Sequence, residues 1–564
     1  MMKKRAIILN TAIGFGFFIV LLRLADIMIL DHERLNERAR MQQLKGEDVQ
    51  VRRGTIFDRH GREMAVNLEL ESLYCDPAEV ASAEKSAYVL SDLTGKPSQA
   101  ILTKLNSGRH FVWLDRKLEP DVARKIKETK IKGLAFVPDA KRFYPKGHLA
   151  SHILGFVDID NKGIEGVELK YHSTLSTSGR KVLRSRDASG KTLSQGVDME
   201  SRGNNLVLTI DEGLQYMVET ELDRAMEKWR AVAAAAIMMD PLTGDILALA
   251  NRPSFNPNSR SGSKDFQRRN RAITDCYEPG STFKIIIGTA ALEEKVVSLD
   301  TPFDCSRGVV EVGRRVIHDA HKHGLLTFKE VIQKSSNVGS VMVGMKLGKE
   351  RIYKYAKAFG FGEKTGIDLP GEVSGLIRPP ERWSGVSIGS VPIGQEVAVT
   401  PLQVLRAYSA IANGGVLVTP HVVSRIIDPD GKTVWTFTGE TKRVLSQKTA
   451  ETFRDILKTV TEDGGTAKSA AVSGNNVAGK TGTAQMVDPR TKRYSTERYI
   501  SSFVGFVPAD SPRIAMIVVI YEPKGQIYGG VVAAPVFQKI AENALSYLDV
   551  PREDNPGDML VVSR

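Results

Sequence analysis

The sequence predicts an α+β protein with an antiparallel sheet and helices on both sides of it, attached to an N-terminal transmembrane helix. Three observations predict this architecture. Strand-like runs lie at both ends of residues 206–550, with helical patterns between them. A Pro-Gly turn delivers Ser281 and Lys284 to the start of an apolar run. Near the N-terminus, a basic tip precedes an apolar segment.

The composition is that of a basic, globular protein. The chain has 564 residues, 42% of them hydrophobic, which is enough for two or more domains with their own cores. Its net charge of +12 raises the option of nucleic-acid binding, but we find no nucleic-acid motif, and an anionic envelope surface or polymer explains the charge better. Three cysteines do not make a disulfide framework. A disulfide between Cys276 and Cys305 is one alternative, and two buried free thiols are the simpler interpretation.

The N-terminal segment is interpreted as an uncleaved membrane anchor over residues 6–30. Residues 6–22 are apolar except for two polar side chains, a length of about 17 residues and near the lower limit for a bilayer span. Basic residues within 1–5 place this tip in the cytoplasm and the rest of the chain outside, on the periplasmic side. A cleaved signal peptide is the alternative, but no small-x-small site follows Leu22.

Residues 31–205 are expected to form a separate, non-catalytic domain. A charged helical stalk covers 31–45, and an insert of helices and short strands covers 77–132. Three charged or Gly-rich blocks are expected to be structural, and the charges of the first are expected to form an internal ion network. They are residues 53–61, residues 142–145 with 155–157, and residues 163–168.

Residues 206–550 are expected to form the sheet domain, followed by a polar tail over 551–564. A β-hairpin with its turn glycine covers 233–250, and central strands cover 501–507 and 514–521. The predicted helices cover 215–229, 328–359, 400–413, 449–462 and 532–545.

Ser281 and Lys284 have the spacing of a serine–lysine acyl-transfer site. Three residues apart on a helix, they share one face. A serine hydroxyl needs a neighbouring base, and a lysine serves as that base when burial or a nearby cation lowers its pKa. The apolar run after Lys284 would supply the burial. Other Ser-x-x-Lys pairs, at 82–85, 178–181 and 261–264, lack the preceding Pro-Gly turn and the apolar run.

Two further motifs follow in order. Ser335-Ser336-Asn337 comes after a predicted helix, and Lys480-Thr481-Gly482-Thr483 comes after a predicted edge strand. A second Lys-Thr-Gly, at 364–366, lies between turns and is a poor place for a strand that lines a site. A second Ser-x-Asn lies at 473–475.

This trio, in this order, is the motif set of penicillin-binding proteins and serine β-lactamases. With the residues around Ser281 and Ser335, the chain resembles a class B penicillin-binding protein, the division-specific peptidoglycan D,D-transpeptidase of the penicillin-binding protein 3 type. The resemblance extends from the anchor to about residue 545. It implies that 31–205 is an elongated, dimerisation-type pedestal and 206–550 a penicillin-binding transpeptidase domain.

The resemblance also implies roles for the motif residues. Ser281 would attack the D-Ala–D-Ala carbonyl of a stem peptide, and Lys284 would take its proton, kept neutral by burial and by the charge of Lys480. Ser335 would relay a proton to the leaving D-alanine, and Asn337 would orient Lys284 and the substrate amide.

The Lys480 strand would bind the donor peptide. Lys480, Thr481, Gly482 and Thr483 would hold its terminal carboxylate, and the N–H groups of Ser281 and Thr483 would form the oxyanion hole. No metal or other cofactor is implied. The implied partners are donor and acceptor stem peptides, β-lactam antibiotics, a SEDS-family glycan polymerase and other divisome membrane proteins.

Four alternatives remain open at this point. The sister transpeptidase of cell elongation shares every motif. A β-lactamase needs a deacylating base, which no motif places. A β-lactam sensor or division scaffold would have a vestigial site. Finally, His318, Asp319, His321 and His323 allow a metal site, although their spacing fits no zinc pattern and a solvated loop is favoured.

Overall fold

The computed structural model describes residues 2–25, 44–47, 52–176, 182–186, 192–194, 202–259, 262–488, 490–491 and 493–553. Its contacts divide the chain into two units, one of residues 1–52 with 176–203 and one of residues 53–175 with 204–564. Most of the expected stalk and of the expected tail lies outside the described residues.

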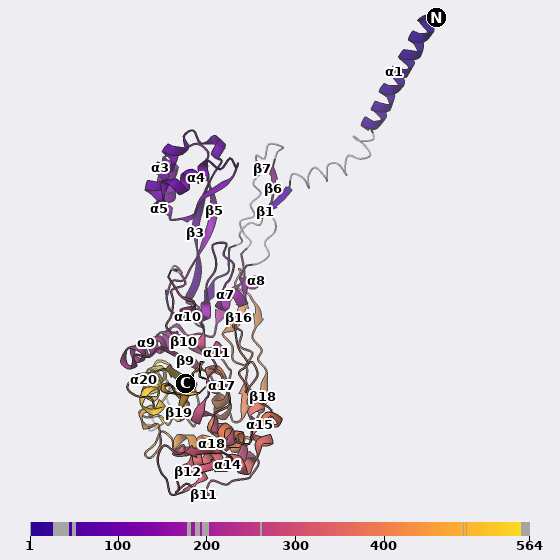
Figure 1. Ribbon diagram of the computed structural model, residues 1–564. Coiled ribbons are helices and arrows are strands. Elements are labelled where there is room, and N and C mark those ends of the chain that lie inside the picture. The colour runs from indigo at the N-terminus through magenta and orange to yellow at the C-terminus, as the bar shows by residue number, and fades with distance from the viewer. Residues whose placement is uncertain are drawn as a thin grey trace, which may run out of the picture. The chain divides into compact units, whose positions relative to one another are not determined.

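The first unit contains the N-terminal helix α1 (Met2–Ala25) and a three-stranded sheet in the order β1-β6-β7 (Figure 1). These strands are β1 (Leu44–Glu47), β6 (Val182–Arg186) and β7 (Thr192–Ser194). Among the residues that the structure describes, no helix combines the length and the apolar composition that a bilayer crossing requires.

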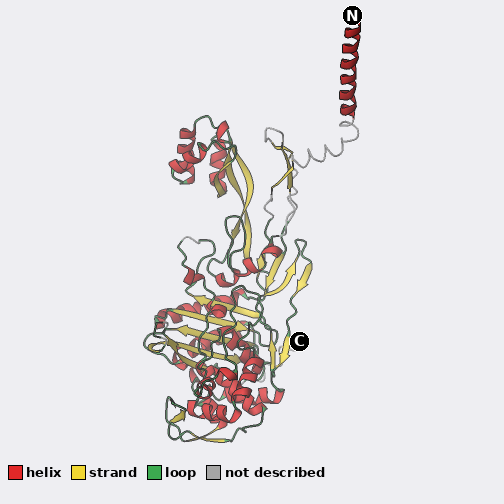
Figure 2. Cartoon of the chain, turned by 45° about the vertical axis from the view of Figure 1, so that its right-hand side comes forward, coloured by secondary structure: helices red, strands yellow, loops and turns green. Residues whose placement is uncertain are grey.

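The second unit is built on a five-stranded antiparallel sheet in the order β10-β9-β21-β20-β19. Helices cover both of its faces, as Figure 2 shows, and this confirms the predicted α+β architecture. The strands are β9 (Ala233–Met239), β10 (Ile246–Arg252), β19 (Ala478–Val487), β20 (Tyr494–Val507) and β21 (Ile514–Tyr521).

The alternation of side chains along the strands divides the core in two. On β9, Ala234 and Met238 pack with α9 (Glu212–Trp229) and α20 (Ala534–Tyr547). Ile237 packs on the other side, into the core around α12 (Lys284–Glu293) and α17 (Pro401–Ala412). Both faces of the sheet are therefore buried, which explains why its central strands are continuously apolar.

Helices were predicted over 328–359, with the first ending in a polar turn before Ser335, and the structure confirms that end. Three helices occupy that range, α13 (Phe328–Gln333), α14 (Asn337–Leu347) and α15 (Lys349–Ala358). The other long helices are α12 (Lys284–Glu293), α17 (Pro401–Ala412) and α18 (Gln447–Lys458). The first break lies at Ser335, whose φ of 56° is left-handed and ends a helix.

A second sheet joins distant parts of the chain in the order β17-β16-β8-β2-β3-β4, with β5 also paired to β3. We call residues 53–175 the pedestal region. Its strands β2 to β5 continue through β8, in which the predicted domain boundary lies, to β16 and β17. The strands are β2 (Ile56–Phe57), β3 (Glu63–Cys75), β4 (Val112–Leu118), β5 (Leu134–Phe143), β8 (Asn205–Leu208), β16 (Val423–Ile427) and β17 (Thr433–Thr436).

The remaining elements are short or peripheral. The insert contains α3 (Ala83–Thr94), α4 (Ser98–Leu105) and α5 (Pro120–Glu128). Short helices are α6 (Ser151–Leu154), α7 (Gly166–Lys170), α8 (His172–Leu175), α10 (Asp265–Arg268), α11 (Arg271–Thr274), α16 (Ser387–Ser390) and α19 (Gly529–Val532). Small ladders pair β11 (Pro302–Asp304) with β14 (Leu325–Thr327), β12 (Val309–Val312) with β13 (Arg315–His318), and β15 (Val416–Val418) with β18 (Thr441–Arg443).

The three charged blocks meet at one buried carboxylate, Glu168, which has 0% solvent exposure. Arg53 Nε donates to its Oε2 at 2.5 Å, and Arg142 Nε donates to its Oε1 at 2.6 Å. The Tyr144 hydroxyl donates to Oε1 at 3.3 Å. The ion network predicted for the first block is therefore found at Arg53, but it also includes Arg142, Tyr144 and Glu168 of the other two blocks, which the sequence did not predict.

The cysteines are all free thiols. Cys75 and Cys305 are buried, but Cys276 is exposed. The expectation that both Cys276 and Cys305 are buried is therefore wrong for Cys276. Cys276 lies at the surface, although the next residue, Tyr277, is buried and forms a β-bridge with Val399.

Candidate active site

Ser281 lies in a short 3-10 helix, η3 (Gly280–Phe283), and the α-helix α12 begins at Lys284. The sequence predicted that Ser281 lies at the start of the α-helix. In the structure it lies in the 3-10 turn that precedes this helix. Gly280 has a φ of 55°, and a Cβ at this position would lie 3.2 Å from the Thr483 carbonyl oxygen. The turn therefore packs directly against the edge of β19.

Lys284 is enclosed by protein, with 0% exposure, and donates to three acceptors. They are the Ser335 carbonyl oxygen at 2.7 Å, Asn337 Oδ1 at 2.9 Å and Ser335 Oγ at 3.2 Å. Burial lowers the pKa of Lys284 to about 7, against the opposing charge of Asp319. The amine therefore exists in both protonation states near neutral pH, as a general base requires.

Ser335 connects the two residues of the first motif. Its Oγ donates to Ser281 Oγ at 3.0 Å and accepts from Lys284 Nζ at 3.2 Å. The left-handed conformation of Ser335 places this residue between α13 and α14. Backbone strain of this kind is common at functional sites and costs about 1–3 kcal/mol.

Asp319 is a functional residue that sequence reasoning missed. Its carboxylate accepts from the Ser336 hydroxyl at 2.8 Å, from the Asn337 N–H and from the Val338 N–H at 3.1 Å. It therefore binds the N-terminus of α14, which orients Asn337 toward Lys284. The only sequence signal was its position among histidines, which suggested a metal site instead.

Among the described residues, no group of three or more His, Cys, Asp or Glu side chains is placed to bind a metal ion. His318 contributes its backbone carbonyl, which accepts from Asn337 Nδ2 at 2.9 Å. The segment that raised the metal hypothesis thus supports the second motif through Asp319 and His318.

Lys480 lies on β19, the edge strand of the sheet, as predicted. Its side chain nevertheless has 0% exposure, the same as that of Lys284. Its Nζ donates only to Thr481 Oγ1, at 3.4 Å, among the described residues. Burial, and then the charge of Lys284, lower the pKa of Lys480 well below its ordinary value.

The rest of the third motif is held from two sides. Thr481 Oγ1 lies 3.1 Å from Thr466 Oγ1, and the Gly529 N–H donates to Thr483 Oγ1 at 3.1 Å. Gly482 faces the 3-10 turn, where a Cβ would lie 3.0 Å from Thr282 Cγ2. The strand edge and the Ser281 turn are thus in contact.

The second Lys-Thr-Gly takes part in a different interaction. Thr365 donates through its N–H and its hydroxyl to Glu372, at 2.7 and 2.5 Å, inside a loop. The second Ser-x-Asn lies in a turn bridged between Val472 and Asn475. Neither belongs to the cluster around Ser281. The structure thus brings the chosen motifs together: a serine hydroxyl, a second hydroxyl and an amine of lowered pKa form a hydrogen-bonded series suited to acyl transfer.

Two family profiles match the chain. Residues 48–208 match the penicillin-binding protein dimerisation domain, and residues 234–542 match the penicillin binding protein transpeptidase domain. The pedestal region lies within the first match, and all three motifs lie within the second.

Relatives and solved structures agree with these matches. Stage V sporulation protein D of Bacillus subtilis (strain 168) is 37% identical over 96% of this chain and 85% of the relative. Peptidoglycan D,D-transpeptidase FtsI of Escherichia coli (strain K12) is 33% identical over 94% of this chain and 89% of the relative.

Among solved structures, penicillin-binding protein 3 of Mycobacterium tuberculosis in complex with aztreonam has a TM-score of 0.70 and 29% identity. The match covers 89% of this chain and 97% of that one. The chain therefore belongs to the class B penicillin-binding proteins of the penicillin-binding protein 3 type, and it is a serine-type peptidoglycan D,D-transpeptidase.

Proposed function

We propose that this enzyme cross-links stem peptides during septal cell-wall synthesis in bacterial division, through an acyl-enzyme on Ser281 that β-lactams also form. The observation that supports the acyl-enzyme is the series from Ser281 Oγ through Ser335 Oγ to Lys284 Nζ, with steps of 3.0 and 3.2 Å. It supplies both the nucleophile and a route for its proton.

In the acylation step, neutral Lys284 receives the Ser281 proton through the Ser335 hydroxyl. Ser281 Oγ forms a bond with the carbonyl carbon of the penultimate D-alanine. The amide C–N bond then breaks, and the leaving D-alanine amine receives a proton from Ser335, which Lys284 replaces. Asn337 orients Lys284 through its Oδ1.

The third motif binds the donor and stabilises the oxyanion. Lys480, Thr481 and Thr483 receive its terminal carboxylate, with Gly482 allowing the close approach of the Ser281 turn. The N–H groups of Ser281 and Thr483 stabilise the oxyanion. In the second step, an amine of a neighbouring stem peptide attacks the ester, a new amide forms, and Ser281 regains its proton.

The cellular setting is part of the same proposal. Residues 6–30, most of which lie in α1, anchor the protein in the cytoplasmic membrane, with residues 1–5 inside and the catalytic domain on the outer side. Residues 31–205 form the non-catalytic domain and 206–550 the transpeptidase domain. A SEDS-family glycan polymerase and other divisome membrane proteins are the expected partners.

Labelling with a fluorescent penicillin tests the acyl-enzyme. Wild-type protein is expected to label covalently at Ser281, and Ser281→Ala is expected to lose labelling without a change in melting temperature. Labelling of Ser281→Ala at another serine would refute the assignment. A reporter active only in the cytoplasm, fused at Arg564, is expected to be silent; activity there would refute the topology.

Depletion in cells tests the septal role. Filaments support division, and rounded cells would point to the elongation enzyme instead. The similarity to a stage V sporulation protein adds a third outcome: normal vegetative growth with failed spores would assign the enzyme to sporulation. Either of the last two outcomes would contradict the septal proposal and leave the acyl-enzyme intact.

A further inference from the structure

Glu278, three residues before Ser281, accepts hydrogen bonds from two other elements. Its Oε1 accepts the Glu396 N–H at 2.9 Å and the Tyr494 hydroxyl at 3.1 Å. Glu396 lies in the loop after the 3-10 helix Val391–Ile393, and Tyr494 is the first residue of β20. None of the roles described above uses Glu278.

The loop of residues 394–399 runs alongside the segment that leads to Ser281. Tyr277 and Val399 exchange two backbone hydrogen bonds, of 3.0 and 2.9 Å, and the Gly280 N–H donates to the Gly394 carbonyl at 3.2 Å. The bond from Glu396 to Glu278 lies between these two points. The motif segment is therefore bound to the loop along its length.

The loop conformation carries a cost. Glu396 has a φ of 62°, which is unfavourable for a residue with a Cβ. Its own carboxylate accepts the Ser387 hydroxyl at 2.6 Å. Burial, with a contribution from the charge of Glu396, raises the pKa of Glu278. The neighbouring carboxylates of Glu278 and Glu396, and the left-handed backbone of Glu396, are unfavourable by themselves, and the hydrogen bonds around them offset this cost.

Arg315 connects this cluster to the second motif. It is the first residue of β13, and its two Nη atoms donate to Ser390 Oγ at 2.6 Å and to Gln395 Oε1 at 2.5 Å. The same strand ends at His318, whose carbonyl accepts from Asn337. Arg315 also faces Glu278 and Tyr494 closely enough to lower the pKa of each, against the effect of burial.

Tyr494 connects the cluster to the third motif. It lies on β20, and β20 pairs with β19, the strand that contains Lys480 and Thr483. The bonds of Glu278 thus reach elements adjoining both other motifs, while its own backbone leads into the Pro279-Gly280 turn.

We propose that Glu278 is a positioning residue for acyl transfer. Its carboxylate accepts hydrogen bonds from Glu396 and Tyr494, and these bonds orient the Ser281 turn relative to Ser335 and Thr483. It transfers no proton. The inference rests on the Ser281 acyl-enzyme proposed above.

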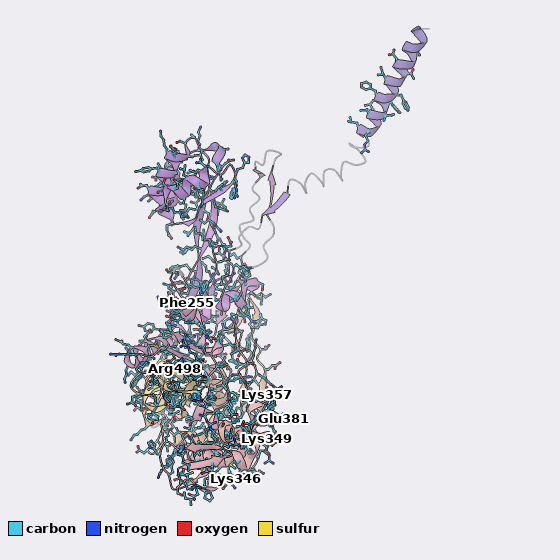
Figure 3. The ribbon with its side chains drawn as sticks, viewed as in Figure 1. Phe255, Lys346, Lys349, Lys357, Glu381 and Arg498 are labelled. Carbon is cyan, nitrogen blue, oxygen red and sulfur yellow. The ribbon has the colours of Figure 1, made fainter. Side chains whose placement is uncertain are left out.

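The test compares Glu278→Ala, Glu278→Gln and Tyr494→Phe in the full-length protein, with Glu381→Ala as the control. Glu381 is an exposed glutamate labelled in Figure 3. Stopped-flow labelling with fluorescent penicillin separates the acylation rate constant at saturation from the Kd of the non-covalent complex, and a thermal melt monitors folding.

Glu278→Ala is expected to lower the acylation rate constant about tenfold or more, because a small misplacement of the nucleophile is costly. Its Kd should change by less than about twofold. Glu278→Gln keeps the acceptor oxygen and should remain within about threefold of wild type, with an unchanged pH profile. Tyr494→Phe removes one bond and should cost about threefold, even if Glu278→Ala folds poorly. Glu381→Ala should match wild type.

Three results would overturn the inference. They are a wild-type rate in both Glu278→Ala and Tyr494→Phe, a Glu278→Gln variant as slow as Glu278→Ala, or a loss confined to Kd, which would make Glu278 a ligand contact. Persistent labelling of Ser281→Ala would instead overturn the proposed acyl-enzyme, so the two failures are distinguishable.

Discussion

Glu168 in the pedestal region and Lys284 in the active site are both charged-type side chains with 0% exposure, and their surroundings differ in charge balance. Glu168 lies between two arginines. Lys284 has neutral oxygens as hydrogen-bond acceptors, and it faces a second buried lysine, Lys480. A buried charge with opposite charges around it stays ionised, whereas a pair of like charges cannot both remain ionised.

The pKa directions express this contrast. Burial raises the pKa of Glu168, but Arg142 and Arg53 outweigh burial and lower it below the ordinary value. For Lys284, burial lowers the pKa to about 7, and Asp319 opposes this only in part. In this protein, a buried charge that is paired with opposite charges stabilises the fold, whereas a buried amine without a balancing charge has a lowered pKa and can act as a base.

The largest expected effect comes from removing the neutral form of Lys284. Lys284→Arg should lower penicillin acylation by about 1,000-fold or more, because arginine does not give up its proton. Lys480→Arg replaces an amine of lowered pKa with a permanent cation that can still bind a carboxylate, and should lose less, about 10- to 100-fold, since the larger guanidinium must fit a fully enclosed position. Labelling rates measure both, and equal rates in the two variants would contradict the assignment of Lys284 as the base.

Glu168→Gln tests the other side of the comparison. It leaves Arg53 and Arg142 buried without their carboxylate and should lower the free energy of unfolding by about 3–5 kcal/mol. Denaturant unfolding measures this loss, and the exposed Glu381→Gln should show none.

Penicillin labelling of the folded Glu168→Gln protein should stay unchanged. In the wild type, the lowered pKa means that Glu168 contributes its full stabilisation above about pH 4.3, and that this is lost as the pH falls further. A variant as stable as wild type would show that this network contributes little to folding.

A change of pH is expected to have a moderate effect on the acylation rate. With a Lys284 pKa of about 7, the neutral fraction falls as pH decreases below that value. The acylation rate should therefore fall about tenfold per pH unit below 7 and level off above it. Stopped-flow labelling across pH measures the profile, and a constant rate between about pH 6 and 9 would remove the case for Lys284 as general base.

The smallest expected effect is a gain in stability. Lys480→Met replaces a buried amine that has one long hydrogen bond among the described residues, and should raise the free energy of unfolding by about 1 kcal/mol while weakening penicillin acylation. Lys349→Met, at a half-exposed position labelled in Figure 3, is the control and should change stability by less than about 0.5 kcal/mol. A destabilised Lys480→Met would mean that this lysine is structural.

The active-site motifs were predictable because their signals are local. Pro279 and Gly280 mark the turn before Ser281, and the apolar run after Lys284 marks the buried helix. The end of the helix before Ser335 was predictable from the polar run that follows it, but the left-handed conformation of Ser335 was not, because a residue with a Cβ rarely adopts it. In the structure, the left-handed Ser335 holds its Oγ within hydrogen-bond distance of Ser281 and Lys284, which are distant in sequence.

The sequence by itself determined the α+β architecture, the order of the motifs and the choice of Lys480 over Lys364, since periodicity and turn residues act over a few positions. Tertiary structure alone decided the rest. It joined β8 to β2 and β16 in one sheet, enclosed Lys480 completely, and directed Asp319 to the N-terminus of α14. These outcomes depend on contacts between residues far apart in the chain, where burial and pairing partners are set by packing that no local pattern encodes.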